Sequence, residues 1–483
     1  LFWLFGHPEV YIIFLPAAGI VSTVLPVMAR VPLMGYAWVV AAVLTLAFLS
    51  FGLWVHHMFT VGIPHMALGF FSAASLLVAV PTAVQVFAWL GTLWAGRPRM
   101  QLPMLYLVGF FVVFVMGGLT GVMLASVPFD WQAHDSHFVT AHLHYVLVGG
   151  FVFPLLAGAY YWLPHFTGNR NAYGLGKAAF WLIFIGFNAT FLLMHLTGLL
   201  GMPRRVQTYP DDAGWTGLNL LSSVGSFVMA FGFALFAIDV ALSLALGRRA
   251  RRNPWDATTL EWAMPTPAPS YNFASLPHVE QREPLAHDDA LPLTLAQGRG
   301  YLGRVRGNLR ETLGVEMNSG RVEQLVVLPG NTALPIVTAA VTGLFFLSLL
   351  FKLYWATPLC AAVLLALAWR WAWVLGRDSG SGAVDIGGGG RGAPHREAAE
   401  APGWWGSIFT LVADAALFGS LLFGLAYLRV VTPGAAPPAA FDARVSDLVA
   451  GAASFALAAI AVARAAAANC RAARHRAAWW LLG

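Results

Sequence analysis

Charged residues and cysteines are both scarce in this chain of 483 residues. Asp, Glu, Lys and Arg make up 10% of it, and its two cysteines are Cys360 and Cys470. Two cysteines so far apart provide neither a disulfide framework nor a cysteine-ligated metal site. The sequence starts at Leu1 without an initiator methionine or a signal peptide, so we expect it to be an internal part of a longer protein.

Hydrophobic residues, by contrast, make up 58% of the chain, and the mean hydropathy is +0.69. Many apolar runs are long enough to cross a hydrocarbon layer of about 30 Å. This pattern predicts an all-α fold, a polytopic transmembrane helical bundle. About eleven spans are expected, at roughly 8–29, 36–60, 66–95, 102–127, 137–163, 174–200, 218–246, 333–353, 354–376, 405–430 and 445–466.

Basic residues give these spans an orientation. They gather in alternate loops, which the positive-inside rule makes cytoplasmic. The opposite loops carry few basic residues besides Arg204 and Arg205. The net charge of +6 then indicates anchoring to anionic lipid, and no nucleic-acid partner is expected. The cytoplasmic loops carry Arg30, Arg97, Arg99, Arg170, Lys177, Arg248, Arg249, Arg251 and Arg252.

The composition changes along the chain and suggests five regions. After the first seven spans comes a polar stretch rich in Pro, Arg and Glu, then two spans, a glycine-rich linker and two more spans. Such glycine-rich stretches behave as flexible linkers. The predicted boundaries are 1–252, 253–331, 332–377, 378–403 and 404–483.

The run HDSHFVTAHLHY at 134–145 puts several metal-binding side chains at one end of an apolar helix. His142 and His144 are two residues apart, so on a helix they point about 200° apart. They cannot share one ion, but each can reach a different metal. The helix that carries them is therefore expected to lie between two cofactors.

Histidines from three segments fall at the same, non-cytoplasmic level. His7 opens the first span, His56 and His57 close the second, and His142 and His144 open the fifth. A single histidine on an apolar helix is usually a core residue, but polar groups gathered in a bilayer are costly and usually functional. His7, His56 and His57 would form a three-imidazole site suited to copper, zinc or iron, with a position left open for a substrate.

Two further polar residues accompany His7. Tyr11 lies at i+4, on the same helix face, and is either a phenol beside a redox metal or an ordinary interhelical tyrosine. Glu9 lies on the opposite face, and a carboxylate in hydrocarbon costs about 2.5–3.5 kcal/mol, so it is either a protonated proton carrier or a neutral helix brace.

Two polar pairs lie outside the apolar spans, on the non-cytoplasmic side. His134 and Asp135 could bind a hard divalent ion, although a surface turn is the commoner meaning. Arg204 and Arg205 require anions, such as the carboxylates of a buried cofactor.

Five stretches together resemble subunit I of the haem-copper oxygen reductases, and the GHPEVY run resembles the A-type branch, cytochrome c oxidase and its relatives. The resemblance covers about residues 1–280, the second half of that subunit. The five stretches are 6–11 (GHPEVY), 54–59 (WVHHMF), 134–145, 201–205 (GMPRR) and 253–262 (NPWDATTLEW).

The resemblance implies a role for each of the polar residues. His7, His56 and His57 would hold copper B, with Tyr11 cross-linked to His7. Glu9 would be the carboxylate that gates protons. His142 would be the axial ligand of a high-spin haem, and His144 would be one ligand of a low-spin haem. His134 and Asp135 would bind Mg or Mn, and Arg204 and Arg205 would pair with haem propionates.

Other parts of the chain resemble the family less closely. PTAVQVF at 81–87 matches a proton-channel segment that contains Thr82, but Gln85 replaces the channel lysine, so that route is in doubt. Residues 404–430 are similar to the start of subunit III, with Asp414 in place of a glutamate, and 332–377 are similar to a subunit IV module.

The leading hypothesis is a terminal respiratory oxidase that reduces dioxygen to water at a haem-copper binuclear centre and translocates protons. It implies two haems of a type, copper B and Mg or Mn, and a subunit II at which electrons arrive from cytochrome c or quinol. Its location would be the bacterial cytoplasmic membrane. The alternatives are a nitric oxide reductase-like relative, a proton-coupled transporter or a non-catalytic fragment.

Overall fold

The structure of the chain is a computed structural model. Contacts within the chain divide it into two units, Phe2–Trp405 and Gly406–Gly483, which are described separately. The described residues are 2–170, 174–269, 273, 277, 279–297, 305–306, 309–316, 322–375, 383–387, 390–392, 402–431 and 445–470.

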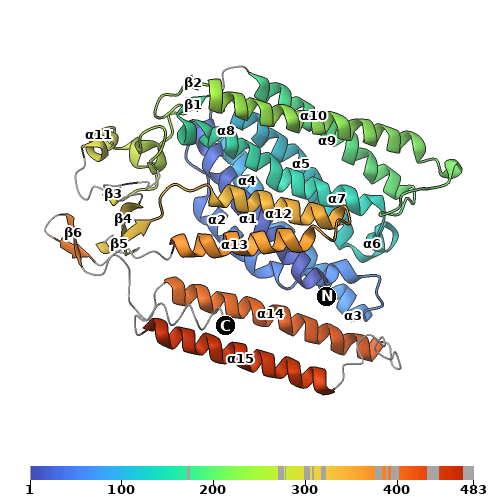
Figure 1. Ribbon diagram of the computed structural model, residues 1–483. Helices are drawn as coiled ribbons and strands as arrows, with labels where there is room; N and C mark the ends of the chain where they lie inside the picture. Colours follow the sequence, from blue (N-terminus) through green and yellow to red (C-terminus); the bar gives the residue numbers. More distant parts are fainter. Residues whose placement is uncertain are drawn as a thin grey trace. The chain divides into compact units, whose positions relative to one another are not determined.

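Apolar helices dominate both units, as Figure 1 shows. Eight helical segments of the described chain are long and apolar enough to cross a membrane, and three shorter apolar helices occupy the other predicted positions. The predicted all-α polytopic bundle is therefore confirmed. The helices are α1 (Phe2–Ala29), α2 (Tyr36–Ser50), α3 (His65–Leu77), α4 (Ala79–Ala95), α5 (Leu102–Ala125), α6 (Val127–Ala133), α7 (His137–Leu147), α8 (Phe153–Thr167), α9 (Leu175–Leu199), α10 (Thr216–Leu246), α11 (Leu291–Ala296), α12 (Leu334–Leu350), α13 (Thr357–Leu375), α14 (Pro402–Val431) and α15 (Val445–Cys470).

The second predicted span, 36–60, differs from the structure. The helix α2 ends at Ser50, and a separate 3-10 helix, η1 (Trp54–Met58), carries His56 and His57. Gly52 lies between the two helices, where its backbone freedom favours a break over a continuing helix. The two histidines therefore lie in a short turn and do not belong to the membrane-length helix.

The fifth span is one helix with an irregular turn. A π-helical turn, Val148–Val152, joins α7 to α8. A Cβ on Gly149 would lie 2.6 Å from the backbone nitrogen of Phe114, so only glycine allows α5 to approach this closely. Such π turns often occur at functional sites.

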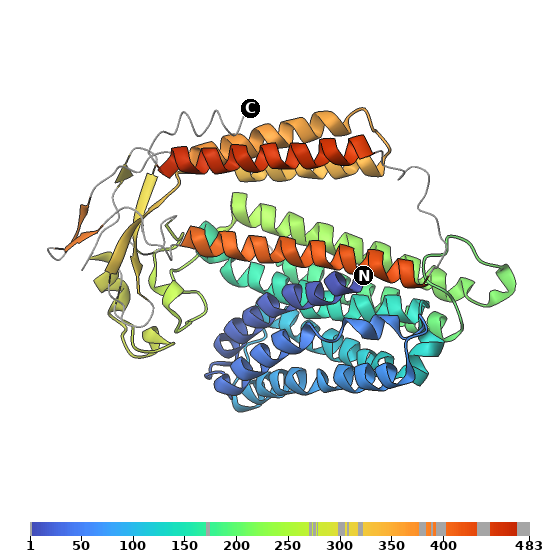
Figure 2. The same cartoon turned by 90° about the horizontal axis from the view of Figure 1, so that it is seen from below.

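The core of the larger unit lies among helices α1, α5, α8 and α9. Figures 1 and 2 show the helices of residues 2–246 side by side, with their axes roughly aligned. Phe114 stacks on Phe14 and on Phe110, with ring centroids 4.9 and 5.2 Å apart. Small residues such as Gly225, whose added Cβ would lie 2.7 Å from the nitrogen of Thr190, bring α9 and α10 into close contact.

The polar region after α10 is held against the helix ends by tryptophans. The Nε1 of Trp262 donates to the Oη of Tyr161 at 2.9 Å, and the Nε1 of Trp255 donates to the carbonyl of Tyr161 at 2.8 Å. Trp262 is fully buried. The described residues of this region also form an antiparallel sheet, β3 (Val305–Arg306), β4 (Leu309–Val315) and β5 (Val322–Leu328), with an irregular register at Gly314 and Val315.

The remaining elements are simpler. The helices α12 and α13 pack against each other, and α14 and α15 belong to the second unit. Two short antiparallel pairs complete the described strands, β1 (Asn169–Arg170) with β2 (Arg248–Arg249) and β6 (Val384–Gly387) with β7 (Gly390–Gly392). The predicted linker at 378–403 lies mostly outside the described residues, apart from β6, β7 and the first residues of α14.

Candidate metal centre

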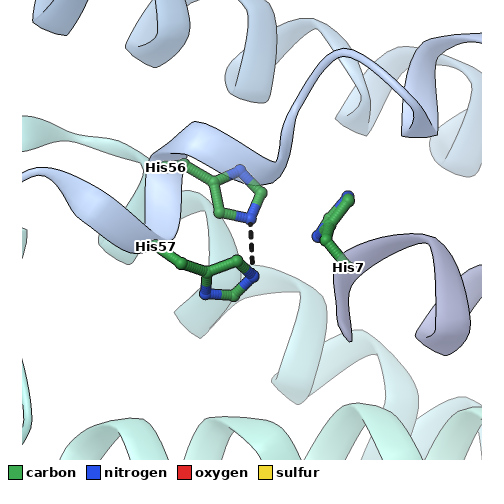
Figure 3. Close-up of side chains that lie close together, drawn as sticks. All are labelled: His7, His56 and His57. Atoms are coloured by element: carbon green, nitrogen blue, oxygen red, sulfur yellow. Dashed lines mark hydrogen bonds between the residues drawn. The ribbon is translucent and has the colours of Figure 1, made fainter. Parts of the chain in front are cut away.

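Three imidazoles converge between α1 and η1, as Figure 3 shows. His7 comes from α1, and His56 and His57 come from η1. One ligand atom from each ring lies within 4.8 Å of the other two. The Nε2 of His7 is buried and has no hydrogen-bond partner, and the Nε2 atoms of His56 and His57 are 3.2 Å apart. Three ring nitrogens, one of them without a hydrogen-bond partner, thus face one space. They form a donor set that fits a metal ion.

Ser75 on α3 fixes the tautomer of His56. Its hydroxyl donates its proton to the carbonyl of Phe71 at 2.6 Å, so the Oγ accepts from the Nδ1 of His56 at 2.8 Å. The Nδ1 of His56 therefore carries the proton, and its Nε2 presents a lone pair to the site. A metal-ligating histidine is usually oriented in this way by its second nitrogen.

Aromatic contacts complete the surroundings of these rings. Trp3 stacks on His57 with centroids 3.6 Å apart and planes 12° apart. Tyr11 lies edge-on to His7 at 4.8 Å. Sequence reasoning missed both Trp3 and Ser75. Trp3 could have been found from its i−4 spacing to His7, whereas Ser75 carries no comparable signal.

Glu9 is partly buried on α1. It has no hydrogen-bond or ion-pair partner among the described residues. It comes two residues after His7 on α1, so it lies on the opposite face of this helix from His7.

His142 faces α5. Its Nδ1 lies 3.0 Å from the carbonyl of Gly117 and 3.1 Å from the Oγ1 of Thr120. A carbonyl can only accept, so the Nδ1 of His142 carries the proton and its Nε2 is free to bind a metal. A Cβ on Gly121 would lie 2.8 Å from the Cε1 of this ring, so glycine makes room for it. His142 also lies close enough to His56 and His57 to interact with them electrostatically, so it is near the three-imidazole site.

His144 faces the opposite side of α7. Its ring stacks on Phe191 of α9, with centroids 4.1 Å apart and planes 14° apart. Its Nδ1 donates to the carbonyl of Thr140 at 2.8 Å, which again leaves Nε2 without a proton. The two histidines thus project toward different neighbouring helices.

A charged network lies beyond the C-terminal ends of α5 and α9. His134 bonds through Nδ1 to the Oδ2 of Asp130 at 2.9 Å, and this hydrogen bond raises the pKa of His134 above its usual value. A guanidinium nitrogen of Arg204 lies 2.6 Å from the Oδ1 of Asp135. The Nε of Arg204 is buried without a partner. Arg205 is exposed with a backbone φ of 68° and does not join the network.

Asp130 was missed by the sequence reasoning. It lies in α6, one helical turn before His134, and is almost fully buried. An acidic residue at i−4 from a histidine could have suggested this pairing.

The predicted proton-path residues lie on α4. Gln85 is fully buried, its Nε2 is 3.4 Å from the carbonyl of Pro81, and its Oε1 has no partner. Thr82 donates to the carbonyl of Val78 at 3.1 Å. A buried amide oxygen without a partner is unfavourable by about 1–3 kcal/mol, so this position favours a bound water molecule.

Membrane-length helices around a partly buried cluster of three imidazoles define a polytopic membrane protein with a candidate histidine-ligated metal site. Residues 1–228 match the family described as "Cytochrome C and Quinol oxidase polypeptide I".

Individual relatives agree with this assignment. Cytochrome c oxidase subunit 1 of Alkalihalophilus pseudofirmus is 48% identical over 289 residues, covering 60% of this chain and 46% of the relative. The proteins of the same name from Bacillus sp. strain PS3 and Bacillus subtilis are 50% and 47% identical, over 58% and 59% of this chain and 46% of each relative. The chain thus spans about half the length of the curated relatives it matches.

Proposed function

We propose that about residues 1–280 of this chain are the second half of the catalytic subunit of a terminal respiratory oxidase. Its reaction is the reduction of dioxygen to water at a haem-copper binuclear centre, coupled to proton translocation across the bacterial cytoplasmic membrane. The observation that carries the proposal is the convergence of His7, His56 and His57 within 4.8 Å, with His142 close by. The family of residues 1–228 supports it.

His7, His56 and His57 would hold copper B. The fit rests on the unsatisfied Nε2 of His7 and on the proton of His56, which Ser75 keeps on Nδ1. Neutral imidazoles with exposed lone pairs suit copper, and three protein ligands leave one position open. When bound, copper and a haem iron would supply the oxygen-binding site and part of the electrons for reducing dioxygen.

His142 would bind the iron of a high-spin haem and His144 that of a low-spin haem, both of the a type. Each has its Nδ1 proton donated to a backbone carbonyl and its Nε2 unprotonated, the state that an axial ligand requires. Because the two rings face α5 and α9 respectively, α7 would separate the two haems.

Protons would reach this centre through groups on α1 and α4. Tyr11, whose ring lies 4.8 Å from that of His7, would donate a proton and an electron at the site. Glu9 would carry protons on the other face of α1. Thr82 and Gln85 would hold water molecules in the second route, where Gln85 orders a water but cannot carry charge.

His134 and Asp135 would bind Mg or Mn. The Nδ1 of His134 is held by Asp130, so Nε2 remains for the ion, 4.0 Å from the Oδ2 of Asp135. Arg204 and Arg205 would pair with haem propionates, and the buried, unpartnered Nε of Arg204 is suited to such an anion.

Further partners follow from the same proposal. They are dioxygen, the lipid bilayer and a subunit II that accepts electrons from cytochrome c or quinol. Residues 404–483 would be a subunit III-like region fused to this chain.

The test uses the full-length protein purified with its partner subunits. We expect reduced-minus-oxidised spectra with two haem signals, one of which shifts with carbon monoxide, and oxygen consumption that exceeds nitric oxide consumption. His56→Ala should abolish bound copper while both haem signals remain. His65→Ala, which removes an exposed histidine nearby, is the control. Absent haem bands would instead indicate a transporter, and preferential nitric oxide consumption would indicate the reductase.

A further inference from the structure

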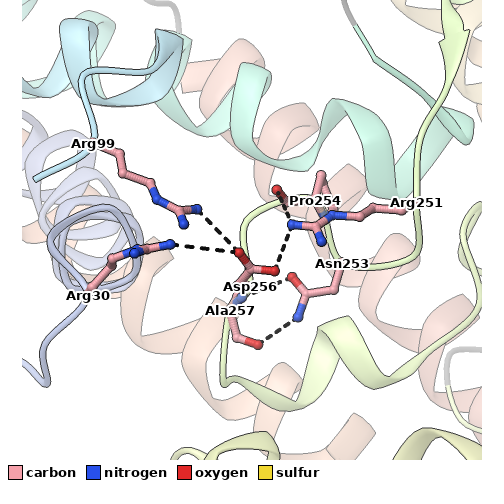
Figure 4. Close-up of polar contacts among 7 residues, drawn as sticks. All are labelled: Arg30, Arg99, Arg251, Asn253, Pro254, Asp256 and Ala257. Carbon is pink, nitrogen blue, oxygen red and sulfur yellow. Dashed lines mark hydrogen bonds and ion pairs between the residues drawn. The ribbon is translucent and has the colours of Figure 1, made fainter.

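Three arginines surround one carboxylate at the ends of the helices, as Figure 4 shows. The Oδ1 of Asp256 lies 2.7 Å from Arg251, and its Oδ2 lies 3.3 Å from Arg99 and 4.0 Å from Arg30. We call Arg30, Arg99, Arg251 and Asp256 the arginine cluster. Its side chains come from three separate loops.

Backbone contacts hold these loops in place. Arg97 and Arg99 donate their backbone N–H groups to the carbonyls of Ala29 and Met28, at 2.8 and 2.9 Å, so this loop is bound to the end of α1. Asn253 exchanges two hydrogen bonds with the backbone of Ala257, at 2.9 and 2.7 Å. The arginines are therefore brought together by the fold and do not meet by side-chain flexibility alone.

The arginine cluster has more positive than negative charge. Three guanidiniums share one carboxylate, and no second carboxylate contacts them within the described part of the chain. Like charges this close repel one another unless an anion lies between them. The side chains of Arg30, Arg99 and Arg251 are 48, 33 and 62% exposed, so an anion can reach them.

The position of the cluster indicates which anion this is. Arg30 directly follows α1, and Arg99 lies just before α5, so both are at the membrane-water boundary. Exposed aromatic side chains occupy the same level, including Trp94 near the end of α4 and Trp38 near the start of α2. Tryptophan at this depth is typical of the lipid headgroup region.

We propose that the arginine cluster binds the phosphate of an anionic phospholipid on the cytoplasmic side of the membrane. Guanidinium groups bind phosphate through paired hydrogen bonds, and basic pockets between helix ends bind lipid headgroups. The acyl chains would lie along the apolar surface near Trp94.

The test measures lipid binding to the full-length protein after its native lipids have been removed by detergent exchange. Native mass spectrometry would compare phosphatidylglycerol with phosphatidylcholine of the same acyl chains, and inorganic phosphate would be added as a competitor. The variant is R30Q/R99Q. The control, R170Q/R249Q, also removes two positive charges, from exposed residues of the β1–β2 pair.

We expect phosphatidylglycerol to bind wild type and R170Q/R249Q at least tenfold more tightly than R30Q/R99Q, which corresponds to about 1.4 kcal/mol. Asp256→Asn should bind at least as tightly as wild type, because it removes a competing negative charge while asparagine tolerates the positive φ of this position. Equal losses in both double variants would show an effect of net charge alone and overturn the proposal. If inorganic phosphate displaced the lipid at a similar concentration, the cluster would be a site for free phosphate, and the proposal of a phospholipid ligand would be overturned.

Discussion

Replacing Ser75 with alanine tests how the proposed copper site is held. The change removes the oxygen that accepts from the Nδ1 of His56 at 2.8 Å, at a position where the serine side chain is 4% exposed. His56 can then carry its proton on either nitrogen, and its ring is no longer held toward His7 and His57. Loss of such an orienting partner usually weakens metal binding about 10–100-fold, or about 1.4–2.8 kcal/mol.

The assay is copper retention by the purified full-length protein during titration with a chelator, followed by metal analysis, with haem spectra recorded on the same samples. Ser75→Thr keeps the hydroxyl and should bind copper almost as wild type does. Ser72→Ala is the matched control, since Ser72 lies on the same helix and bonds to the carbonyl of Ala125 at 2.7 Å, away from the histidines. Equal copper retention in Ser75→Ala and Ser72→Ala would refute the proposed role of Ser75.

Three further predictions follow from contacts elsewhere in the larger unit. Gly121→Ala should shift the spectrum of the high-spin haem and leave the low-spin haem unchanged, because its Cβ would lie 2.8 Å from the His142 ring; unchanged bands from both would contradict this. In protein stripped of divalent ions, Asp130→Asn should lower the thermal unfolding temperature more at pH 6 than at pH 9. Because the pKa of His134 is raised, its ion pair with Asp130 stabilises the fold fully below about pH 6.5. This stabilisation is lost as the pH rises through the folded-state pKa. An effect of Asp130→Asn that does not depend on pH would count against the pair. Trp262→Phe should lower the unfolding free energy by about 1 kcal/mol or more through loss of the bond to Tyr161, measured by denaturation against the exposed control Trp94→Phe; equal effects would exclude that bond as the cause.

Much of the architecture could be predicted from the sequence because a bilayer imposes a local rule. A segment that crosses it must be apolar over about 20 residues, so hydropathy alone located the long apolar helices, although not the short helices α6 and α11. The opposite directions of His142 and His144 followed from their spacing, since two residues on a helix are about 200° apart. The convergence of His7 with His56 and His57 was expected from their common level in the membrane.

Only the tertiary structure decided how these groups are held. The break after Ser50 placed His56 and His57 in a 3-10 helix, where hydropathy predicted a continuous span. Ser75 and Thr120 orient histidines that lie 19 and 22 residues away, on other helices. No periodicity encodes such a contact, because it depends on how close two helices pack, and that distance is set by residues such as Gly149 and Gly121 where a side chain would collide.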